Sequence, residues 1–430
     1  MQLQAHIQIT NPKETKQGLV GSFKEASNVL LLDGNTSGSD TFDWMLAVGT
    51  VDEISVGTDA AFDKLQDFYD KHKDWVFGSM SYDLKNGLEN LQSTHCDKIQ
   101  FPDLHFFLPK YLFIYKDNKL AIYKHTSVSE FDLCILKSPI IPSGIAFSGA
   151  ITNKVSKKKY INNVNLIKEH IQRGDIYEMN YCQEFYAEKT NLNPFETFTR
   201  LNSISKAPFS SYYKVGGKYL LSASPERYIK KVGSKIISQP IKGTRKRGKD
   251  LEEDERLKIE LYEDQKERSE NVMIVDLVRN DLSKIAMKNS VKVAELFGIY
   301  TFDQVHQMIS TISCEVDGQT SLKEILEATF PMGSMTGAPK ISAMQLIEKF
   351  ETSQRGLYSG AVGYINPQGD FDFNVVIRSI QYNALNKYLS FMVGGAITIG
   401  SDAELEYQEC LVKAKALFEV LEQNHAEAVS

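Results

Sequence analysis

The 430-residue chain has few cysteines and no long apolar run. Its five cysteines are scattered, and no two form a C-x-x-C pair, so the sequence indicates neither a disulfide framework nor a zinc knuckle. No stretch approaches the roughly 18 uninterrupted apolar residues of a membrane-spanning helix, and residues 1–20 lack the continuous apolar segment of a signal peptide. We therefore expect a soluble, cytoplasmic protein.

Several familiar catalytic signatures are also missing. The chain has no G-x-S-x-G motif, no P-loop and no Cys/His/Glu signature of a glutamine amidotransferase. Its formal charge of −6 and pI near 5.9 argue against a general nucleic-acid binder or membrane-surface binder. These absences exclude the common serine hydrolases and P-loop kinases.

What the chain does contain is an alternation of strand-like and helix-like segments. Short apolar runs fill residues 1–135, with one helix near 59–72. A Pro/Ser/Gly stretch at 137–144 predicts a boundary between an N-terminal region, 1–140, and a second region, 141–430. Further helices are predicted up to Gly174, from about Leu251 toward Val278, and over 321–329, 338–350 and 403–421. The mixed order predicts an α+β fold rather than a doubly wound parallel sheet.

Two pairs of glutamates have the spacing of a metal site. Glu267 and Glu270 are three residues apart on one predicted helix, and Glu406 and Glu409 are three apart on the last one. This spacing places each pair on one helical face. Oxygen ligands without a nearby cluster of His or Cys favour magnesium over zinc. Either pair alone also fits an ordinary solvated helix face.

Two further segments carry candidate chemistry. Lys242, in S-Q-P-I-K-G-T-R-K-R-G, ends an apolar strand-like run and is followed by Gly243 and more cations. Both a basic surface loop and a reactive lysine fit this pattern. The segment F-P-M-G-S-M-T-G-A-P-K, residues 330–340, places Thr336 and two glycines before a predicted helix. It fits either a tight structural turn or a site for a carboxylate or phosphate.

Three isolated polar residues complete the candidate list. Arg378 lies on an otherwise apolar strand, with Tyr358 one hairpin away. The arginine suits bidentate capture of a carboxylate, and pairing with a structural acid is the alternative. His306 is a lone histidine, which fits a satisfied core residue as well as a catalytic residue beside a substrate.

Seven motifs occur in an order that resembles one enzyme family. They are G-D-I-Y-E-M-N, S-P-E-R, P-I-K-G-T, D-L-V-R-N-D-L, F-P-M-G-S-M-T-G-A-P-K, R-G-L-Y-S-G-A-V-G-Y and E-Y-Q-E-C-L-V-K-A-K-A. Together they are similar to the chorismate-utilising enzymes, which include anthranilate synthase large subunits, aminodeoxychorismate synthase component I, isochorismate synthases and salicylate synthases. The resemblance covers most of residues 150–425. It implies two packed, mostly antiparallel sheets flanked by helices, and makes 141–430 the catalytic region.

The resemblance also implies a branch of the family. P-I-K-G-T, with Lys242, is similar to aminodeoxychorismate synthases, whereas anthranilate synthases usually carry alanine there. Water-using members carry a lysine where this chain has Gln183, so ammonia is the implied nucleophile. The implied reaction forms 4-amino-4-deoxychorismate, for 4-aminobenzoate and folate biosynthesis, with ammonia from a separate glutamine amidotransferase subunit. Anthranilate synthesis and a non-catalytic metal- and anion-binding module are the alternatives.

Roles for the candidate residues follow from the same resemblance. Mg²⁺ would be held by Glu270 and Glu409, supported by Glu267 and Glu406. Glu226 of S-P-E-R would protonate the departing hydroxyl, and Lys242 would add to the ring. A nucleophilic lysine needs a lowered pKa, and we expect burial or the neighbouring cations at 245–247 to lower it. The residues expected to hold the substrate are Gln183, Thr336, Tyr358, Arg378, Gly395 and Lys413.

Overall fold

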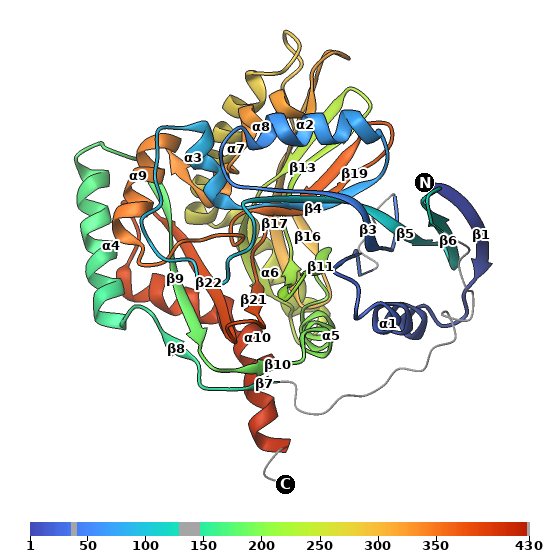
Figure 1. Cartoon of the computed structure of the whole chain (residues 1–430). Helices are drawn as coiled ribbons and strands as arrows, with labels where there is room; N and C mark the ends of the chain where they lie inside the picture. The colour runs from blue at the N-terminus through green and yellow to red at the C-terminus, as the bar shows by residue number, and fades with distance from the viewer. Residues whose placement is uncertain (36–40, 129–146, 428–430) are drawn as a thin grey trace.

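Antiparallel β-structure runs through most of the chain (Figure 1). A computed structural model describes residues 1–35, 41–128 and 147–427. Every strand pairing among these residues is antiparallel. The predicted α+β class is therefore confirmed.

The strands form two layers. Neighbouring strands of the first layer are β9 (Glu178–Ala187), β22 (Tyr388–Ile397), β21 (Ser379–Asn383), β12 (Lys218–Ser224), β11 (Phe209–Val215), β2 (Asn28–Asp33), β3 (Trp44–Val56) and β5 (Leu104–Lys116). The second layer continues through β4 (Val76–Met80), β19 (Ala361–Ile365), β20 (Phe371–Asn374), β13 (Arg227–Val232), β14 (Lys235–Gln239) and β17 (Val305–Glu315). The last strand also pairs with β15 (Ile241–Lys246) and β16 (Lys292–Thr301).

Two long strands connect the layers. β3 and β5 each contain 13 residues and pair with each other across a register shift between Thr50 and Asp52. Such a bulge bends and twists a strand, which lets the sheet pass from one layer to the other. Tyr213 and Leu220 of the first layer share a buried cluster with Phe77 and Val362 of the second. The sheets are therefore packed face to face, as predicted.

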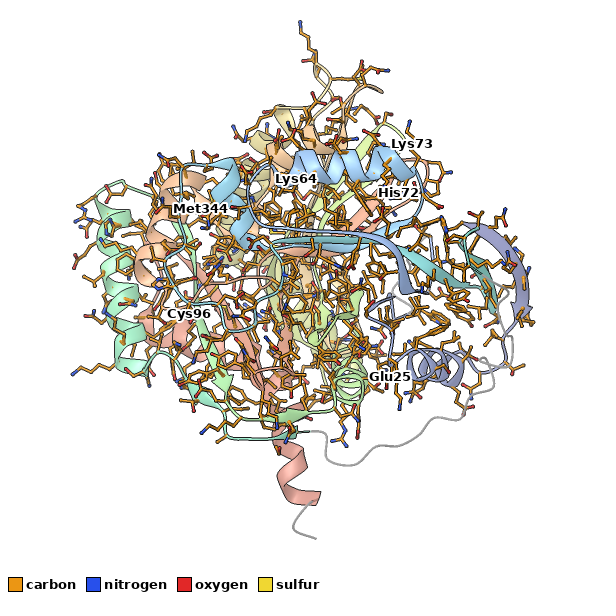
Figure 2. The ribbon with its side chains drawn as sticks, in the orientation of Figure 1. Glu25, Lys64, His72, Lys73, Cys96 and Met344 are labelled. Carbon is orange, nitrogen blue, oxygen red and sulfur yellow. The ribbon has the colours of Figure 1, made fainter. Side chains whose placement is uncertain are left out.

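Helices cover the outer faces of both layers (Figure 1). The first layer is covered by α4 (Lys157–Gln172), α5 (Pro194–Ser205), α9 (Lys340–Phe350) and α10 (Ala403–Glu427). The second is covered by α2 (Ala61–His72), α7 (Gln265–Ser283) and α8 (Leu322–Thr329). Near the N-terminus, β1 (Gln2–Gln8) pairs with β6 (Lys119–Lys124), and α1 (Pro12–Ser22) lies beside this pair (Figure 1). Side chains fill the spaces between these elements (Figure 2).

The long charged helix predicted from Leu251 to Val278 is instead two helices. α6 (Leu251–Glu263) ends at Asp264, whose φ of −62° and ψ of 111° leave the helical region. The Asp264 side chain accepts a hydrogen bond from the Glu267 backbone N–H at 3.1 Å and caps α7. Because of this break, the axis of α7 is independent of that of α6. The orientation of α7 sets where Glu267 and Glu270 lie.

The predicted boundary near residue 140 lies outside the described residues and stays a prediction. Strands from the two regions hydrogen-bond directly, since β2 pairs with β11 and β4 pairs with β19. The remaining predicted helices correspond to α2, α4, α8, α9 and α10. No helix among the described residues combines the length and the apolar character needed to span a membrane.

Candidate active site

A cavity of about 460 Å³ lies where β15, β22, α7 and α10 meet. Its volume suits a small organic ligand. Five glutamates and six lysines or arginines line it, so a ligand bound here meets groups of both charges. The acidic groups are Glu226, Glu267, Glu270, Glu406 and Glu409, and the basic groups are Lys242, Arg245, Lys246, Lys266, Arg378 and Lys413.

Lys242 reaches this cavity because β15 is irregular at that point. The pairing of β15 with β17 shifts register between Ile241 and Thr244, so Lys242 and Gly243 leave the regular ladder. Gly243 has a φ of +86°, and a Cβ atom there would lie 2.9 Å from Leu261 Cδ1 of α6. The positive φ favours glycine after the lysine, and a side chain at this position would also displace the Leu261 methyl group.

The electrostatic surroundings of Lys242 differ from the expected ones. No hydrogen-bond or ion-pair partner lies within reach of its ammonium among the residues the structure describes. Burial acts to lower the pKa of Lys242, but Glu178, Glu270 and Glu226 outweigh it and hold that pKa above its ordinary value. The expectation of a lowered pKa is wrong for the ligand-free protein, in which the amine is protonated.

The cations that follow Lys242 do not counteract these carboxylates. Arg245 donates a hydrogen bond to Asp264 at 2.6 Å, and Arg247 forms a bidentate pair with Asp254, with both distances at 2.8 Å. Each guanidinium is thus neutralised by an acid outside the sequence run. The expectation that these cations lower the pKa of Lys242 rested on their proximity in sequence, and their ion pairs cancel that effect.

Glu226 lies between β12 and β13 with its carboxyl in the cavity wall, and the residue is only 4% exposed. Burial raises the pKa of Glu226 to about 7, against opposing effects of a hydrogen bond from Ser334 and the charge of Lys242. A carboxyl with this pKa is able to donate a proton near neutral pH.

The four predicted metal ligands all line the cavity, two from α7 and two from α10. Buried Glu270 has an Oε1 atom without a hydrogen-bond partner, and burial raises the pKa of this residue to about 7. Lys266 lies between the helices, with its Nζ 3.1 Å from Glu406 Oε1 and 3.8 Å from Glu270 Oε1. In the described part of the chain, no three His, Cys, Asp or Glu side chains enclose a metal-sized space on their own.

Four of the predicted substrate-binding residues also line the cavity: Tyr358, Arg378, Gly395 and Lys413. Arg378 has a positive φ of 51°, a strained conformation for arginine. Within the described ranges its guanidinium has no hydrogen-bond or ion-pair partner, so its donors are available to a ligand. Lys413 pairs with Glu409 at 2.7 Å and donates to the Gly394 carbonyl at 3.0 Å.

Three predicted site residues do not line the cavity. Gln183 is buried opposite Val393 in the β9–β22 pairing, and neighbouring Asn180 lines the cavity instead. The Thr336 hydroxyl donates to carbonyls of its own loop, at 3.2 and 3.3 Å, and Ser334 faces the cavity in its place.

The third residue is His306. Its Nε2 lies 2.9 Å from Asp254 Oδ1, and its Nδ1 lies 3.0 Å from the Thr301 hydroxyl. Both ring nitrogens are thus occupied in a fully buried environment. This geometry is that of a satisfied core histidine.

Sequence reasoning missed two charged residues near Lys242 and the glutamates. Lys266 directly precedes Glu267, but a lysine on a charged helix gives no distinctive signal. Glu178 belongs to the G-D-I-Y-E-M-N motif and received no role. Glu178 is a carboxylate on a strand with apolar neighbours, and this placement could have marked it as a candidate site residue.

Comparison with known proteins identifies the class of enzyme. A family model described as chorismate binding enzyme matches residues 27–419. Aminodeoxychorismate synthase component 1 of Escherichia coli is 32% identical over 351 residues, covering 81% of this chain and 77% of that protein. Anthranilate synthase component 1 of Acetivibrio thermocellus is 32% identical over 371 residues, covering 80% and 74%.

Solved structures agree with this assignment. Anthranilate synthase component I from Streptococcus pneumoniae has a TM-score of 0.75 at 27% identity, covering 88% of this chain and 92% of that chain. The isochorismate synthase MenF from Escherichia coli has a TM-score of 0.77 at 16% identity, covering 98% and 95%, which shows a common fold. The fold and cavity are thus those of a chorismate-utilising enzyme. The chain belongs to the chorismate binding enzyme family, and among its relatives are several proteins named aminodeoxychorismate synthase component 1.

Proposed function

We propose that this chain aminates chorismate, with ammonia as the nitrogen source, to give 4-amino-4-deoxychorismate. The observation that carries the proposal is the position of Lys242, in one cavity with Glu226 and the four glutamates of α7 and α10. A non-catalytic binding module has no need for a buried acid with a pKa of about 7 beside an amine.

Chorismate carries two carboxylates and a poor leaving group, its ring hydroxyl. Arg378 and Lys413 supply cations for the carboxylates, and Tyr358 and Gly395 line the same cavity. We assign Mg²⁺ to Glu270 and Glu409, with Glu267 and Glu406 in support. The Glu270 Oε1 atom, which accepts no hydrogen bond, and the all-oxygen donor set fit this ion, which takes its remaining ligands from water and substrate. When bound, the ion supplies a Lewis acid for a substrate carboxylate.

Lys242 and Glu226 then perform the exchange. The Lys242 ammonium first releases a proton to solvent, which it takes up again after turnover. The neutral amine then forms a C–N bond to the ring while the ring C–O bond breaks, and Glu226 gives its proton to the departing hydroxyl, which leaves as water. Ammonia next forms the new C–N bond and displaces Lys242 as a free amine. The product amine returns the proton to Glu226, so the atoms and charges balance over one turnover.

Ammonia requires a source, and we expect a separate glutamine amidotransferase subunit to supply it. The designation component 1 of several relatives supports a multi-subunit enzyme. Anthranilate synthesis is the second candidate, because a relative of that name is equally similar. The two activities differ in their products: anthranilate forms with release of pyruvate, whereas the aminated chorismate keeps its side chain.

The test is incubation with chorismate, Mg²⁺ and ammonium, followed by mass identification of the product. We expect a mass corresponding to exchange of one hydroxyl for one amino group, and no pyruvate. Lys242→Ala should lose this product while retaining its fold, and Lys249→Ala, which removes an exposed lysine from the same segment, should keep it. Anthranilate with pyruvate, or full turnover by Lys242→Ala, would refute the proposal.

A further inference from the structure

Arg355 and Glu351 form an ion pair in the interior of the protein. Glu351 directly follows α9, Arg355 lies between α9 and β19, and each residue is 3% exposed. Arg355 Nε lies 2.9 Å from Glu351 Oε2, and Arg355 Nη2 lies 2.6 Å from Glu351 Oε1. Neither residue lines the cavity or enters the mechanism above. Apolar side chains of similar size often stabilise a protein as well as a buried ion pair does, so stability alone does not account for this one.

The Arg355 guanidinium uses all five of its N–H donors. Besides the two bonds to Glu351, Nη1 donates to the Met335 carbonyl at 2.6 Å and to the Ser359 hydroxyl at 3.4 Å. Nη2 also donates to the Asn180 carbonyl at 3.0 Å. One guanidinium thus joins β9 and the loop at 334–336 to its own segment. Only an arginine side chain offers enough donors in a fixed arrangement to make all of these contacts.

The loop at 334–336 is held by three consecutive carbonyl groups. The Ser334 carbonyl accepts a hydrogen bond from Asn180 Nδ2 at 3.3 Å, and the Thr336 carbonyl accepts one from the Asn180 backbone N–H at 2.8 Å. The carbonyl between them, that of Met335, is the one that Arg355 binds. These oxygens are therefore engaged inside the protein, while the loop contributes Ser334 and Met335 to the cavity lining. A carbonyl oxygen released from such a bond would repel the carboxylates of a ligand.

Further contacts connect the ion pair to the cavity. The Arg355 carbonyl accepts a hydrogen bond from the Tyr358 backbone N–H at 3.1 Å, and Glu351 Oε1 accepts one from the Cys182 backbone N–H at 2.8 Å. Cys182 Sγ in turn donates to Asn180 Oδ1 at 2.9 Å and lies 3.8 Å from the Tyr358 hydroxyl oxygen. Cavity-lining residues from three separate segments are thus fixed relative to one another through a single ion pair.

We propose that Arg355 is a positioning residue for the substrate. With Glu351 as its counter-ion, it fixes Asn180, the loop at 334–336 and Tyr358 where they line the cavity. Arg355 does not itself line the cavity, so it acts on the substrate through the residues it holds. The inference rests on the proposed function, which makes chorismate the molecule that these residues surround.

A displaced loop would affect the reaction directly. The Ser334 hydroxyl donates a hydrogen bond to Glu226, the proposed acid, so a shift of the loop moves a partner of the group that protonates the departing hydroxyl. A misplacement of about 1 Å, caused by a residue away from the chemistry, costs on the order of 10²-fold in rate. A pair needed only for folding would instead change activity only through the amount of folded protein.

The kinetic test separates position from stability. Arg355→Met combined with Glu351→Leu replaces both charges by apolar side chains, and Arg355→Lys keeps the positive charge but loses the planar fork. We expect each of these variants to lose about 10²-fold in kcat/KM for chorismate under conditions where both are folded. Wild-type kcat/KM in either variant would overturn the inference.

Ile122→Ala is the control for lost stability. Ile122 is fully buried on β6, and within the described part of the chain β6 contributes no residue to the cavity. The lost packing should lower the urea midpoint of unfolding, while kcat/KM of the folded protein stays near the wild-type value. A loss of kcat/KM in Ile122→Ala that matches the loss in the Arg355 variants would attribute the effect to stability and refute the positioning role.

A second measurement does not depend on turnover. Hydrogen exchange of the ligand-free protein is followed by mass spectrometry for the peptide that contains residues 332–337. In the variant that combines Arg355→Met and Glu351→Leu, this peptide should exchange up to about tenfold faster, as expected for loss of one hydrogen bond, while peptides from β6 keep their wild-type rate. Unchanged exchange of the 332–337 peptide would contradict the inference. If wild type makes no aminated chorismate, the proposed function fails, and the exchange rate still decides whether the ion pair holds the loop.

Discussion

The Glu226→Gln substitution should separate stability from catalysis at one buried group. The pKa of Glu226 is raised from an ordinary 4.5 to about 7, chiefly by burial. The folded state therefore binds the proton more tightly than the unfolded chain. The contribution of this group to stability is complete below pH 4.5 and is lost as the pH rises to 7. At about 1.36 kcal/mol per pH unit, the loss amounts to about 3 kcal/mol.

Glutamine has nearly the same shape and cannot ionise, so the variant avoids this loss. We expect metal-free Glu226→Gln to exceed wild type in stability by less than about 1 kcal/mol at pH 5 and by up to about 3 kcal/mol at pH 8. Urea unfolding of metal-free protein at pH 5, 6, 7 and 8 measures the difference. Glu255→Gln, which removes an exposed carboxylate paired with Lys258, should stay within about 0.5 kcal/mol of wild type throughout.

Turnover should change in the opposite direction. Wild-type activity that depends on the Glu226 proton should fall as the pH rises through about 7. Glu226→Gln should lose about 10²- to 10⁴-fold in kcat, because no acid remains for the hydroxyl. A stability difference that is the same at every pH, or a variant with normal turnover, would refute this account of Glu226.

Three further substitutions test other parts of the site and fold. Arg378→Gln should raise KM for chorismate about 10- to 100-fold through loss of a charged hydrogen bond, with an unchanged circular dichroism spectrum; an unchanged KM would argue against carboxylate binding there. Lys266→Gln should tighten Mg²⁺ binding about fivefold in titration calorimetry, because the cation between the helices is removed; weaker binding would contradict its role as a competitor. Arg355→Met should cost about 3–5 kcal/mol of unfolding free energy, since buried Glu351 loses the partner whose nitrogen lies 2.6 Å away. Adding Glu351→Leu should recover part of that loss, and no recovery would show that the pair is not the cause.

The features that were predictable from sequence are mostly local ones. The glutamate pairs were found because three-residue spacing fixes their relative position within a helix. The start of α7 could also have been predicted, because Asp264 and Glu267 have the spacing of a capped helix start. It was missed because charged residues continue without interruption from α6 into α7.

The orientation of single side chains was less predictable. Gln183 and Asn180 are three residues apart on β9 and so point to opposite faces, and the choice between faces depends on packing against β22 and α10. The pKa of Lys242 was predicted with the wrong direction because its sequence neighbours are cations, whereas its spatial neighbours are carboxylates from other elements. Such long-range electrostatic contacts have no signature in a single sequence.

The most direct test of the central claim is a search for the covalent intermediate on Lys242. Wild-type protein is mixed with chorismate and Mg²⁺ without ammonia, quenched with acid and digested. The mass of the peptide containing Lys242 is then measured by mass spectrometry. The account predicts an added mass equal to chorismate less one water, which is absent when Mg²⁺ is withheld. An unmodified Lys242 peptide in wild type, under conditions where ammonium supports turnover, would contradict it.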